Sequence, residues 1–318
     1  MTDLTDVDAL HLMCRGGYDL QKLRVQMGLR LCANFRSKLK IDPNADNEEE
    51  TEDGELSEQA QSILAQLKAS YRTLTEGVAR NRTLPQEKGF VGDALISTFS
   101  ELTLVDQFVR LDMQEALQFK QMVSVLEKIP IYTEYLKSER GIGPAMASVL
   151  ISYFDSHKAR HASSFWKFAG LDVAPDGRAR SRRAEHLVER EYVGRDGETK
   201  TRLGITYDPF VKTKVLGVLA TSFLRSGSRW RTVYDDYKHR LETDRGRKKV
   251  TVAEWKKLRK AGKEVAHLWT PGRIHRAALR YMVKQFIAEL WIKWRELEGL
   301  PVTPSYHEAK LGHRHAAE

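Results

Sequence analysis

The sequence predicts a mainly α-helical protein with one small β-hairpin. Apolar residues recur at spacings of three and four along most of the 318 residues, which is the period of an amphipathic helix. Only residues 188–205 instead combine two short β-prone runs with a glycine-containing turn. We therefore expect a helical bundle or coiled-coil arm over residues 1–130, a second helical domain over 131–300 that contains a helix-hairpin-helix element, and a tail over 301–318.

The apolar spacing of the N-terminal region predicts a first helix that starts after a break at Gly16 and Gly17. Residues 41–58 then carry nine acidic side chains and no basic one. Because like charges at this density repel one another, this segment is expected to be a solvated loop. The alternative is that it binds the basic half of the chain in competition with nucleic acid. A second helix is expected from Leu56 to about Arg82.

A longer helical pattern covers residues 93–128 and stops at Pro130. Its apolar residues keep the three-and-four spacing throughout, with charged and amide side chains between them. This pattern is typical both of a helix buried in a bundle and of an intermolecular coiled coil, and the sequence leaves both open. We expect a homo-oligomer that forms through this helix.

The two halves of the chain differ in the sign of their charge, although the whole chain has a formal net charge of +9. Residues 1–140 contain 17 Lys and Arg against 23 Asp and Glu, whereas residues 141–318 contain 35 against 20. The basic half predicts a polyanionic partner, which would be DNA or RNA. A basic surface that serves only solubility is the alternative.

A Gly-Ile-Gly-Pro turn lies where the charge changes sign. Gly141, Ile142 and Gly143 separate two helical patterns, and Pro144 suits the first turn of the second helix. In a helix-hairpin-helix element the glycines let the backbone approach a surface, and the free amides then face an anion such as a DNA phosphate. Ala145 is small enough for the two helices to pack closely. We expect contact with the phosphate backbone here, with a purely structural hairpin as the alternative.

Two further basic stretches are candidate contacts with nucleic acid. The first is an arginine-rich loop, and the second is a stripe of cations at helical spacing in a long helix predicted over 270–298. A stripe of this kind can follow a nucleic-acid backbone, although a solvated helix face has the same pattern. The loop contributes Arg178, Arg180, Arg182 and Arg183, and the stripe consists of Arg273, Arg276, Arg280 and Lys284.

The remaining elements follow from turn and helix signals. Val188–Val193 and Thr199–Ile205 predict two strands around a turn at Gly194–Gly197, and helices are expected over 209–224 and 228–241. Basic residues surround Trp230 and Trp255, so these rings are candidates for stacking on bases, with core packing as the alternative.

The stretch GIGPAMASVLISYF, followed by SSFWKFAGLDVAP, resembles the C-terminal domain of the IS-one-ten insertion-sequence transposases. That domain combines a Gly-Ile-Gly-Pro hairpin, a helix that ends in Tyr-Ala-Gly-Leu, a proline and a serine-containing basic loop. The corresponding residues are Gly141–Pro144, Phe168–Leu171, Pro175 and the loop around Ser181. The resemblance covers residues 135–300, with residues 186–203 as an insertion.

The resemblance implies an enzyme of two parts, in which an N-terminal RuvC-like domain supplies acidic metal ligands and a C-terminal serine attacks DNA. Residues 1–130 depart from that plan, because they show no series of strands that would make carboxylates converge on metal ions. We therefore expect no metal site and no cofactor in this chain, and Mg²⁺ only where a partner domain supplies its site. Ser181 is the candidate nucleophile, and the other interpretation is that it only hydrogen-bonds a phosphate.

Three functional hypotheses follow. The first is a DNA-binding protein related to insertion-sequence transposases that acts in recombination or transposition. The alternatives are an active serine-dependent transposase or recombinase, and an RNA-binding or oligomeric assembly module. No Ser-His-Asp arrangement is apparent from the sequence, and the histidines of the tail lack the acidic or cysteine partners of a metal site.

The sequence also predicts where the protein acts. Its longest apolar run is about half of the roughly 20 residues that span a bilayer. The N-terminus lacks the basic start of a signal peptide. We expect no membrane partner and a cytoplasmic, nucleoid-associated protein.

Overall fold

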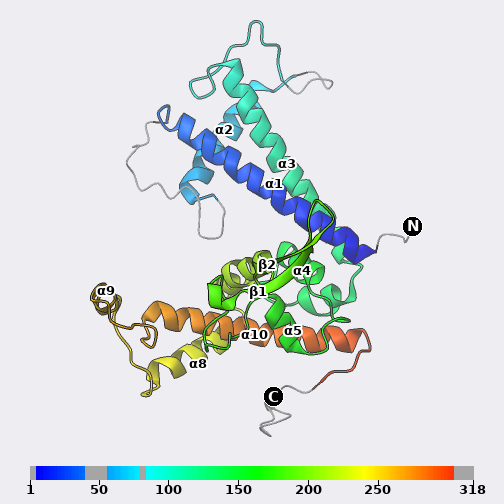
Figure 1. Cartoon of the computed structure of the whole chain (residues 1–318). Helices are drawn as coiled ribbons and strands as arrows, with labels where there is room; N and C mark the ends of the chain where they lie inside the picture. Colours follow the sequence, from blue (N-terminus) through cyan, green and yellow to red (C-terminus); the bar gives the residue numbers. More distant parts are fainter. Residues whose placement is uncertain (1–4, 40–55, 79–83, 304–318) are drawn as a thin grey trace. The chain divides into compact units, whose positions relative to one another are not determined.

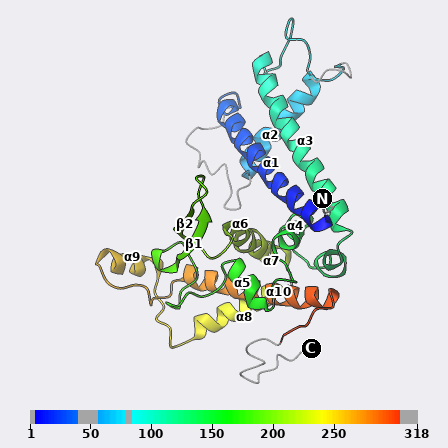
Figure 2. The same cartoon turned by 45° about the vertical axis from the view of Figure 1, so that its right-hand side comes forward.

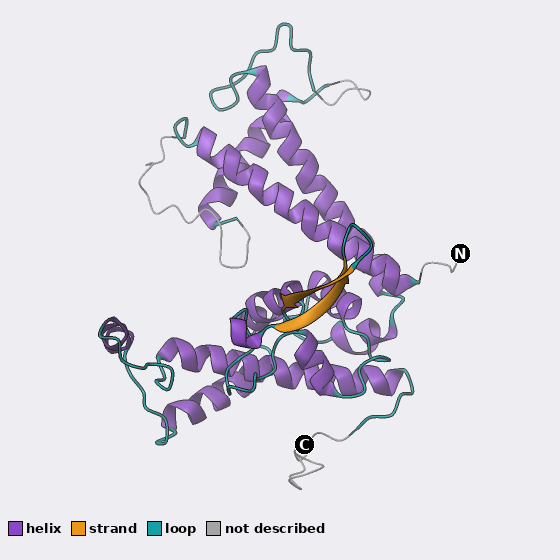
Figure 3. Ribbon diagram, in the orientation of Figure 1, coloured by secondary structure: helices purple, strands orange, loops and turns teal. Residues whose placement is uncertain are grey.

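The computed structural model describes residues 5–39, 56–78 and 84–303. The chain forms two compact units, Met1–Val125 and Leu126–Glu318 (Figure 1). The prediction of a mainly helical protein with one small β-hairpin is confirmed, since the elements are helices apart from one two-stranded antiparallel sheet (Figure 3). None of the helices in these ranges is both long enough and apolar enough to cross a membrane.

The first unit is built from three helices that share one apolar core. They are α1 (Asp6–Phe35), α2 (Glu58–Leu74) and α3 (Phe99–Leu126). The buried side chains at their contacts include Leu31, Phe35, Ile63, Leu67, Leu102, Val105 and Phe108. Of the predicted acidic loop over 41–58, only residues 56–58 lie within the described part of the chain.

The predicted break at Gly16 and Gly17 is wrong, because α1 runs through both glycines. The helix starts at a capping box instead: the Thr5 hydroxyl accepts from the Asp8 amide at 3.1 Å, and the Asp8 carboxylate accepts from the Thr5 amide at 3.3 Å. Gly17 is buried where α1 meets Gln118 and Met122 of α3, so its small size serves helix packing.

Helix α3 starts at Phe99, later than the pattern over 93–128 predicts. The Asp93 carboxylate accepts from the amides of Leu95 and Ile96 at 2.8 and 2.7 Å, which holds a turn ahead of the helix. The face that carries Leu102 is buried within the unit, whereas Met113 is 65% exposed. Burial in a bundle therefore accounts for part of the apolar pattern, and self-association through this helix stays a prediction.

The second unit places its elements around one long helix, α10. In chain order its elements are η1 (Tyr132–Leu136), α4 (Pro144–Tyr153), α5 (Ala162–Phe168), η2 (Ala184–His186), β1 (Val188–Val193), β2 (Thr199–Gly204), α6 (Pro209–Thr213), η3 (Lys214–Leu219), α7 (Ala220–Ser226), α8 (Trp230–Thr243), α9 (Val252–Lys260) and α10 (Pro271–Leu297). Helix α10 packs against α8, α5, α7 and η3 (Figures 1 and 2).

The core of this unit is rich in aromatic rings. Trp230 is 4% exposed and makes edge-to-face contact with Phe286, whose centroid is 5.5 Å away. Phe223 packs on the same two rings, and Trp291 and Trp294 are buried further along α10. Trp230 therefore belongs to the core and is not free to stack on a base, whereas Trp255 lies elsewhere, in α9.

Candidate nucleic-acid interface

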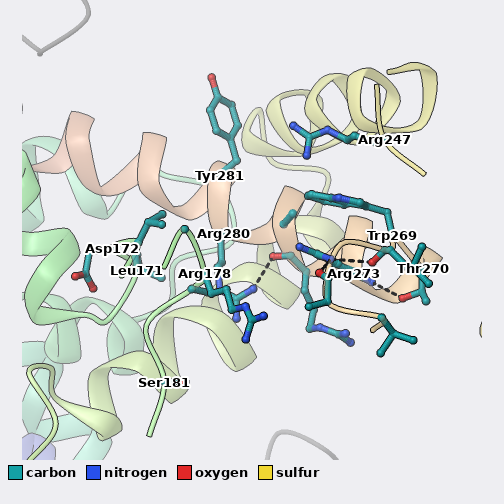
Figure 4. Close-up of a pocket in the computed structure, with 18 of the residues that line it drawn as sticks. Leu171, Asp172, Arg178, Ser181, Arg247, Trp269, Thr270, Arg273, Arg280 and Tyr281 are labelled. Carbon is teal, nitrogen blue, oxygen red and sulfur yellow. Dashed lines mark hydrogen bonds between the residues drawn. The ribbon is translucent and has the colours of Figure 1, made fainter. Parts of the chain in front are cut away.

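A cavity of about 900 Å³ opens beside the first half of α10 (Figure 4). Its walls come from the loop that follows α5, the segment that precedes α10, and helices α8, α9 and α10. Among the described residues that line it, seven are cations, and Asp172 and Glu264 are acids. The cations are Arg178, Arg183, Arg247, Arg273, Arg276, Arg280 and Lys284.

The whole stripe predicted in the last helix lines this cavity. Because Arg273, Arg276, Arg280 and Lys284 follow steps of three and four, α10 presents them on one side. The opposite side of the helix carries buried residues such as Phe286, which fix its rotation. The stripe therefore forms a wall of the cavity. The alternative that the sequence left open was a helix face exposed to bulk water.

The deepest cations of the stripe are partly removed from water, and the charge of Asp172 offsets this only for Lys284. Burial lowers the pKa of Arg280 and of Lys284, and Arg276 lowers that of Arg280 further. The Nε of Arg280 is buried and has no hydrogen-bond partner among the residues that the structure describes. The ammonium of Lys284 lies 4.6 Å from the centroid of the Trp166 ring. A bound anion would stabilise both charges.

Lys212 lies behind the stripe and donates to the backbone oxygen of Arg180 at 2.5 Å. Burial, together with the charges of Arg280 and Arg180, lowers the pKa of Lys212 to about 8, although the charge of Asp172 acts in the opposite direction. Between that pKa and the ordinary value of 10.5, the unfolded chain keeps a proton that the folded chain has released. The free energy of unfolding should therefore rise with pH through this window.

We expect Lys212→Met to remove this rise. The measurement is thermal unfolding of both proteins at a series of pH values across the window, with Lys214→Met as a control on the neighbouring segment. An equal rise in wild type and Lys212→Met would contradict the assignment.

The four arginines of the loop do not act together. Arg178 and Arg183 line the cavity. Arg180 instead donates twice to the Asp172 carboxylate, from Nε at 3.0 Å and from Nη2 at 2.8 Å, in an ion pair largely shielded from water. Arg182 is exposed and outside the described lining of the cavity. The loop therefore places two arginines in the wall of the cavity and uses a third in a structural ion pair.

Two arginines lie over the ring of Trp269 in the wall of the cavity. The guanidinium groups of Arg247 and Arg273 lie 4.4 and 4.3 Å from the centroid of its ring. Arg273 also donates to the backbone oxygen of Leu268 at 2.8 Å, which holds the segment before α10. These contacts occupy Trp269, so the ring better placed for a base is that of Trp255, which lines the same cavity.

Ser181 lines the cavity and belongs to a hydrogen-bonded chain with His186 and Asp176. The Ser181 hydroxyl lies 2.9 Å from Nδ1 of His186, and Nε2 of His186 lies 3.1 Å from the Asp176 carboxylate. His186 is 1% exposed. A hydrogen bond from the Arg178 amide, followed by His186 itself, lowers the pKa of Asp176, so this carboxylate is ionised at neutral pH.

The backbone identifies the tautomer of His186. The amide of Ser181 donates to Nδ1 at 3.0 Å, so Nδ1 carries a lone pair, and the ring proton sits on Nε2, facing Asp176. The hydroxyl of Ser181 faces the same lone pair. This is the arrangement of a nucleophile, a base and an orienting acid.

The sequence expectation of no Ser-His-Asp arrangement is therefore wrong for this loop. Asp176, Ser181 and His186 are five positions apart in the sequence, and a tight loop brings their side chains together. Their closeness in the sequence is the one feature from which this arrangement could have been predicted.

The Gly-Ile-Gly-Pro turn joins η1 to α4 as a helical hairpin. Gly141 has φ +99°, and a Cβ atom there would lie 2.7 Å from Oγ of Ser226. The amide of Ile142 donates to the backbone oxygen of Glu139 at 3.0 Å, so it is already used. Gly143 has φ −91° and is exposed, and no described side chain caps the N-terminus of α4. The end of α4 at Gly143 is thus the part of the turn that is open to an anion.

The two glycines should respond differently to substitution. Gly141→Ala is expected to destabilise the protein by about 2 kcal/mol or more, because the left-handed conformation and the contact with α7 both oppose a Cβ. Gly143→Val should stay within about 1 kcal/mol of wild type but weaken DNA binding, because a branched side chain blocks the approach of a phosphate. Chemical denaturation and a binding titration check the two effects, and unchanged DNA binding by Gly143→Val would contradict a phosphate contact here.

The hairpin is fixed to the middle of the unit by ion pairs. Arg229 donates to the Glu139 carboxylate at 2.6 Å and to that of Glu289 at 3.1 Å. Trp230 Nε1 donates to Glu139 at 3.1 Å, and the Tyr135 hydroxyl donates to Glu289 at 3.1 Å. These bonds connect the hairpin to α8 and to the second half of α10.

The cavity and the hairpin lie at different places along α10. The cavity is lined by Arg273–Lys284, whereas the hairpin is tied to Glu289. Along α10, Lys284 lies five positions from Glu289, which is about 7.5 Å of helix, and Arg273 lies sixteen positions from it, which is about 24 Å. The residues proposed from the sequence therefore form two sites: Gly141–Ala145 at one, and Arg178, Arg183 and the stripe at the other, beside Ser181.

Comparisons with family models, with curated proteins and with solved structures give no match for this chain. The resemblance to insertion-sequence transposases consequently rests on the sequence motifs alone.

No group of three or more His, Cys, Asp or Glu side chains that could hold a metal ion occurs within residues 5–39, 56–78 and 84–303. The histidines of the tail, His307, His313 and His315, lie outside these ranges.

Proposed function

We propose that this chain is a DNA-binding protein related to the insertion-sequence transposases, and that the cavity beside α10 holds the sugar-phosphate backbone. The observation that carries the proposal is the excess of cations over acids in the described lining, with Arg280 and Lys284 partly removed from water. Phosphate groups are the ligands that such a surface attracts. Trp255 in the same lining offers a ring on which a base can stack, whereas Tyr281 is already stacked on Tyr237 at 4.0 Å between ring centroids.

The hairpin provides a second backbone contact. The end of α4 is exposed at Gly143, and the positive end of the helix dipole favours an anion there. Together the two sites support a role in DNA recombination or transposition, at the nucleoid.

A pair of matched variants tests the binding site. Arg178 and Arg182 are exposed arginines of one loop, but only Arg178 belongs to the described lining of the cavity. Arg178→Gln is expected to weaken DNA binding about tenfold and to lower the slope of log K against log salt by about 0.9, and Arg182→Gln should change neither.

The same titration is run with DNA and with RNA. Equal losses in both variants would contradict the proposed site. Tighter binding to RNA than to DNA would favour the RNA-binding or assembly module.

A second candidate function is serine-dependent strand transfer, and the hydrogen bonds among Ser181, His186 and Asp176 favour it. In this step Oγ of Ser181 forms a bond to phosphorus, its proton passes to Nδ1 of His186, and the bond from phosphorus to the leaving oxygen breaks. The imidazolium then returns the proton to that oxygen. The test is a covalent complex with labelled DNA that Ser181→Ala does not form.

Self-association through α3 is part of the same proposal. Met113 and Leu117 lie one helical turn apart on one side of this helix and are 65% and 49% exposed, which supports a contact with a second copy.

A further inference from the structure

The strands β1 and β2 form a ribbon that projects from the helices of the second unit (Figures 2 and 3). Every residue of the two strands is exposed except Gly204, which is partly buried. A two-stranded ribbon without a covering layer is marginally stable in water. Such a ribbon gains stability when a partner covers one of its faces.

The two faces of the ribbon differ in charge. In the antiparallel register Arg190 is opposite Arg202, and Tyr192 is opposite Lys200, so these four side chains share one face. We call this the basic face. The other face carries two acids and mostly neutral residues: Glu189, Glu191 and Val193 of β1, with Thr199, Thr201 and Leu203 of β2.

The basic face holds positive charge that the protein itself does not neutralise. Arg190 and Arg202 are directly opposite each other, an arrangement that destabilises a strand pair. Neither forms an ion pair with any described residue, and Arg202 instead lies 5.0 Å from the ring centroid of Tyr192. Lys200 is paired with Asp196 in the turn. An anion bound between the two arginines would turn the repulsion into attraction.

We propose that the basic face of the ribbon lies in the major groove of B-form duplex DNA; this rests on the DNA-binding function proposed above. Six residues extend each strand over about 20 Å, and the two strands lie about 5 Å apart. The major groove is about 12 Å wide and admits a two-stranded ribbon, whereas the major groove of A-form RNA is too narrow.

The position of the ribbon in the chain agrees with this placement. Strand β1 starts two residues after His186, whose ring is hydrogen-bonded to Ser181 in the cavity wall. A duplex in contact with the ribbon would therefore continue toward the cavity.

The test compares two double variants of the full-length chain that change its net charge equally. Arg190→Gln/Arg202→Gln removes two cations from the basic face. The control, called the threonine variant, is Thr199→Glu/Arg182→Gln, which adds one acid to the opposite face, where Thr199 is paired with Val193, and removes one exposed cation outside the described lining of the cavity. The probes are a mixed-sequence duplex DNA of about 30 base pairs, the same sequence as duplex RNA, and an oligothymidine single strand.

We expect the arginine variant to bind duplex DNA about tenfold or more weakly, with a salt slope lower by about 1.8, while its affinity for single-stranded DNA and duplex RNA stays unchanged. The threonine variant should keep the salt slope of wild type. Arg190→Lys/Arg202→Lys keeps both charges and should bind duplex DNA as wild type does, which shows that the ribbon tolerates substitution at these positions.

Equal losses on all three probes, or an equal loss in the threonine variant, would overturn the placement in the groove. If Arg178→Gln weakens binding and the ribbon variant does not, the ribbon proposal fails while the DNA-binding function stands. If neither variant weakens binding, the DNA-binding function itself fails.

Discussion

Replacing both Arg276 and Lys284 with glutamate is expected to reduce DNA affinity by about 100-fold or more. Both side chains line the cavity, and neither has an ion-pair partner among the described residues. A hydrogen bond to a charged group contributes about 1.5–3 kcal/mol, so each lost contact costs about tenfold or more in Kd, and the reversed charges add repulsion. Fluorescence anisotropy of labelled DNA across a range of salt concentrations measures the change.

The matched control reverses two cations that the cavity does not include. Arg182 is exposed in the loop, and Lys293 is exposed near the end of α10, where it pairs with Glu296. Arg182→Glu/Lys293→Glu changes the net charge by the same amount and should bind within about threefold of wild type, since surface ion pairs contribute little. An equal loss in this control would mean that total charge determines binding and that the cavity is not the site.

Replacing His186, the general base that is hydrogen-bonded to Ser181, should separate DNA binding from the chemical step. If Ser181 attacks a phosphodiester, His186→Gln is expected to lower the rate of covalent complex formation by about 10²–10⁴-fold, the usual contribution of a general base. Asp176→Asn should act in the same direction, because its amide can donate to the ring and leave the proton on Nδ1. DNA affinity should stay close to that of wild type in both variants. Denaturing gels of labelled DNA give the rate, and anisotropy gives the affinity.

Glu185→Gln is the control, because Glu185 adjoins His186 in η2 but is exposed. Unchanged DNA affinity in His186→Gln would show that the loop keeps its shape, although His186 also accepts from the Ser181 amide. A covalent complex that persists in Ser181→Ala would identify another nucleophile and would refute the second candidate function.

Features that depend on local periodicity could be predicted from the sequence. The stripe of α10 follows from the spacing of its cations, because three- and four-residue steps return to one side of any helix. The β-hairpin is confirmed almost to the residue, with β2 ending at Gly204 where Ile205 was expected. Its glycine-containing turn and its alternation of side chains are both local signals.

Features that depend on distant contacts could not be predicted. Glycine has a low helix propensity, so Gly17 reads as a helix break in the sequence. In the structure it lies within α1, where α3 packs against it, and helix propensity takes no account of such a contact. Arg180 looks like its neighbours in the sequence, and only the folded loop shows that Asp172 neutralises it. The hairpin and the arginine loop are close in sequence, but they contact different parts of α10: the hairpin is tied to Glu289, and the loop lines the cavity beside the first half of the helix.

The ion pairs of Arg229 also bear on the length of DNA that the proposed sites would bind. By pairing with both Glu139 and Glu289, Arg229 fixes the hairpin to α10, and Arg273 at the far end of the stripe lies about 24 Å along that helix from Glu289. Base pairs rise by 3.4 Å, so about 24 Å corresponds to roughly seven base pairs. If one duplex reaches from the hairpin to the far end of the stripe, we expect DNA shorter than this to leave Arg273 without a contact and to bind more weakly.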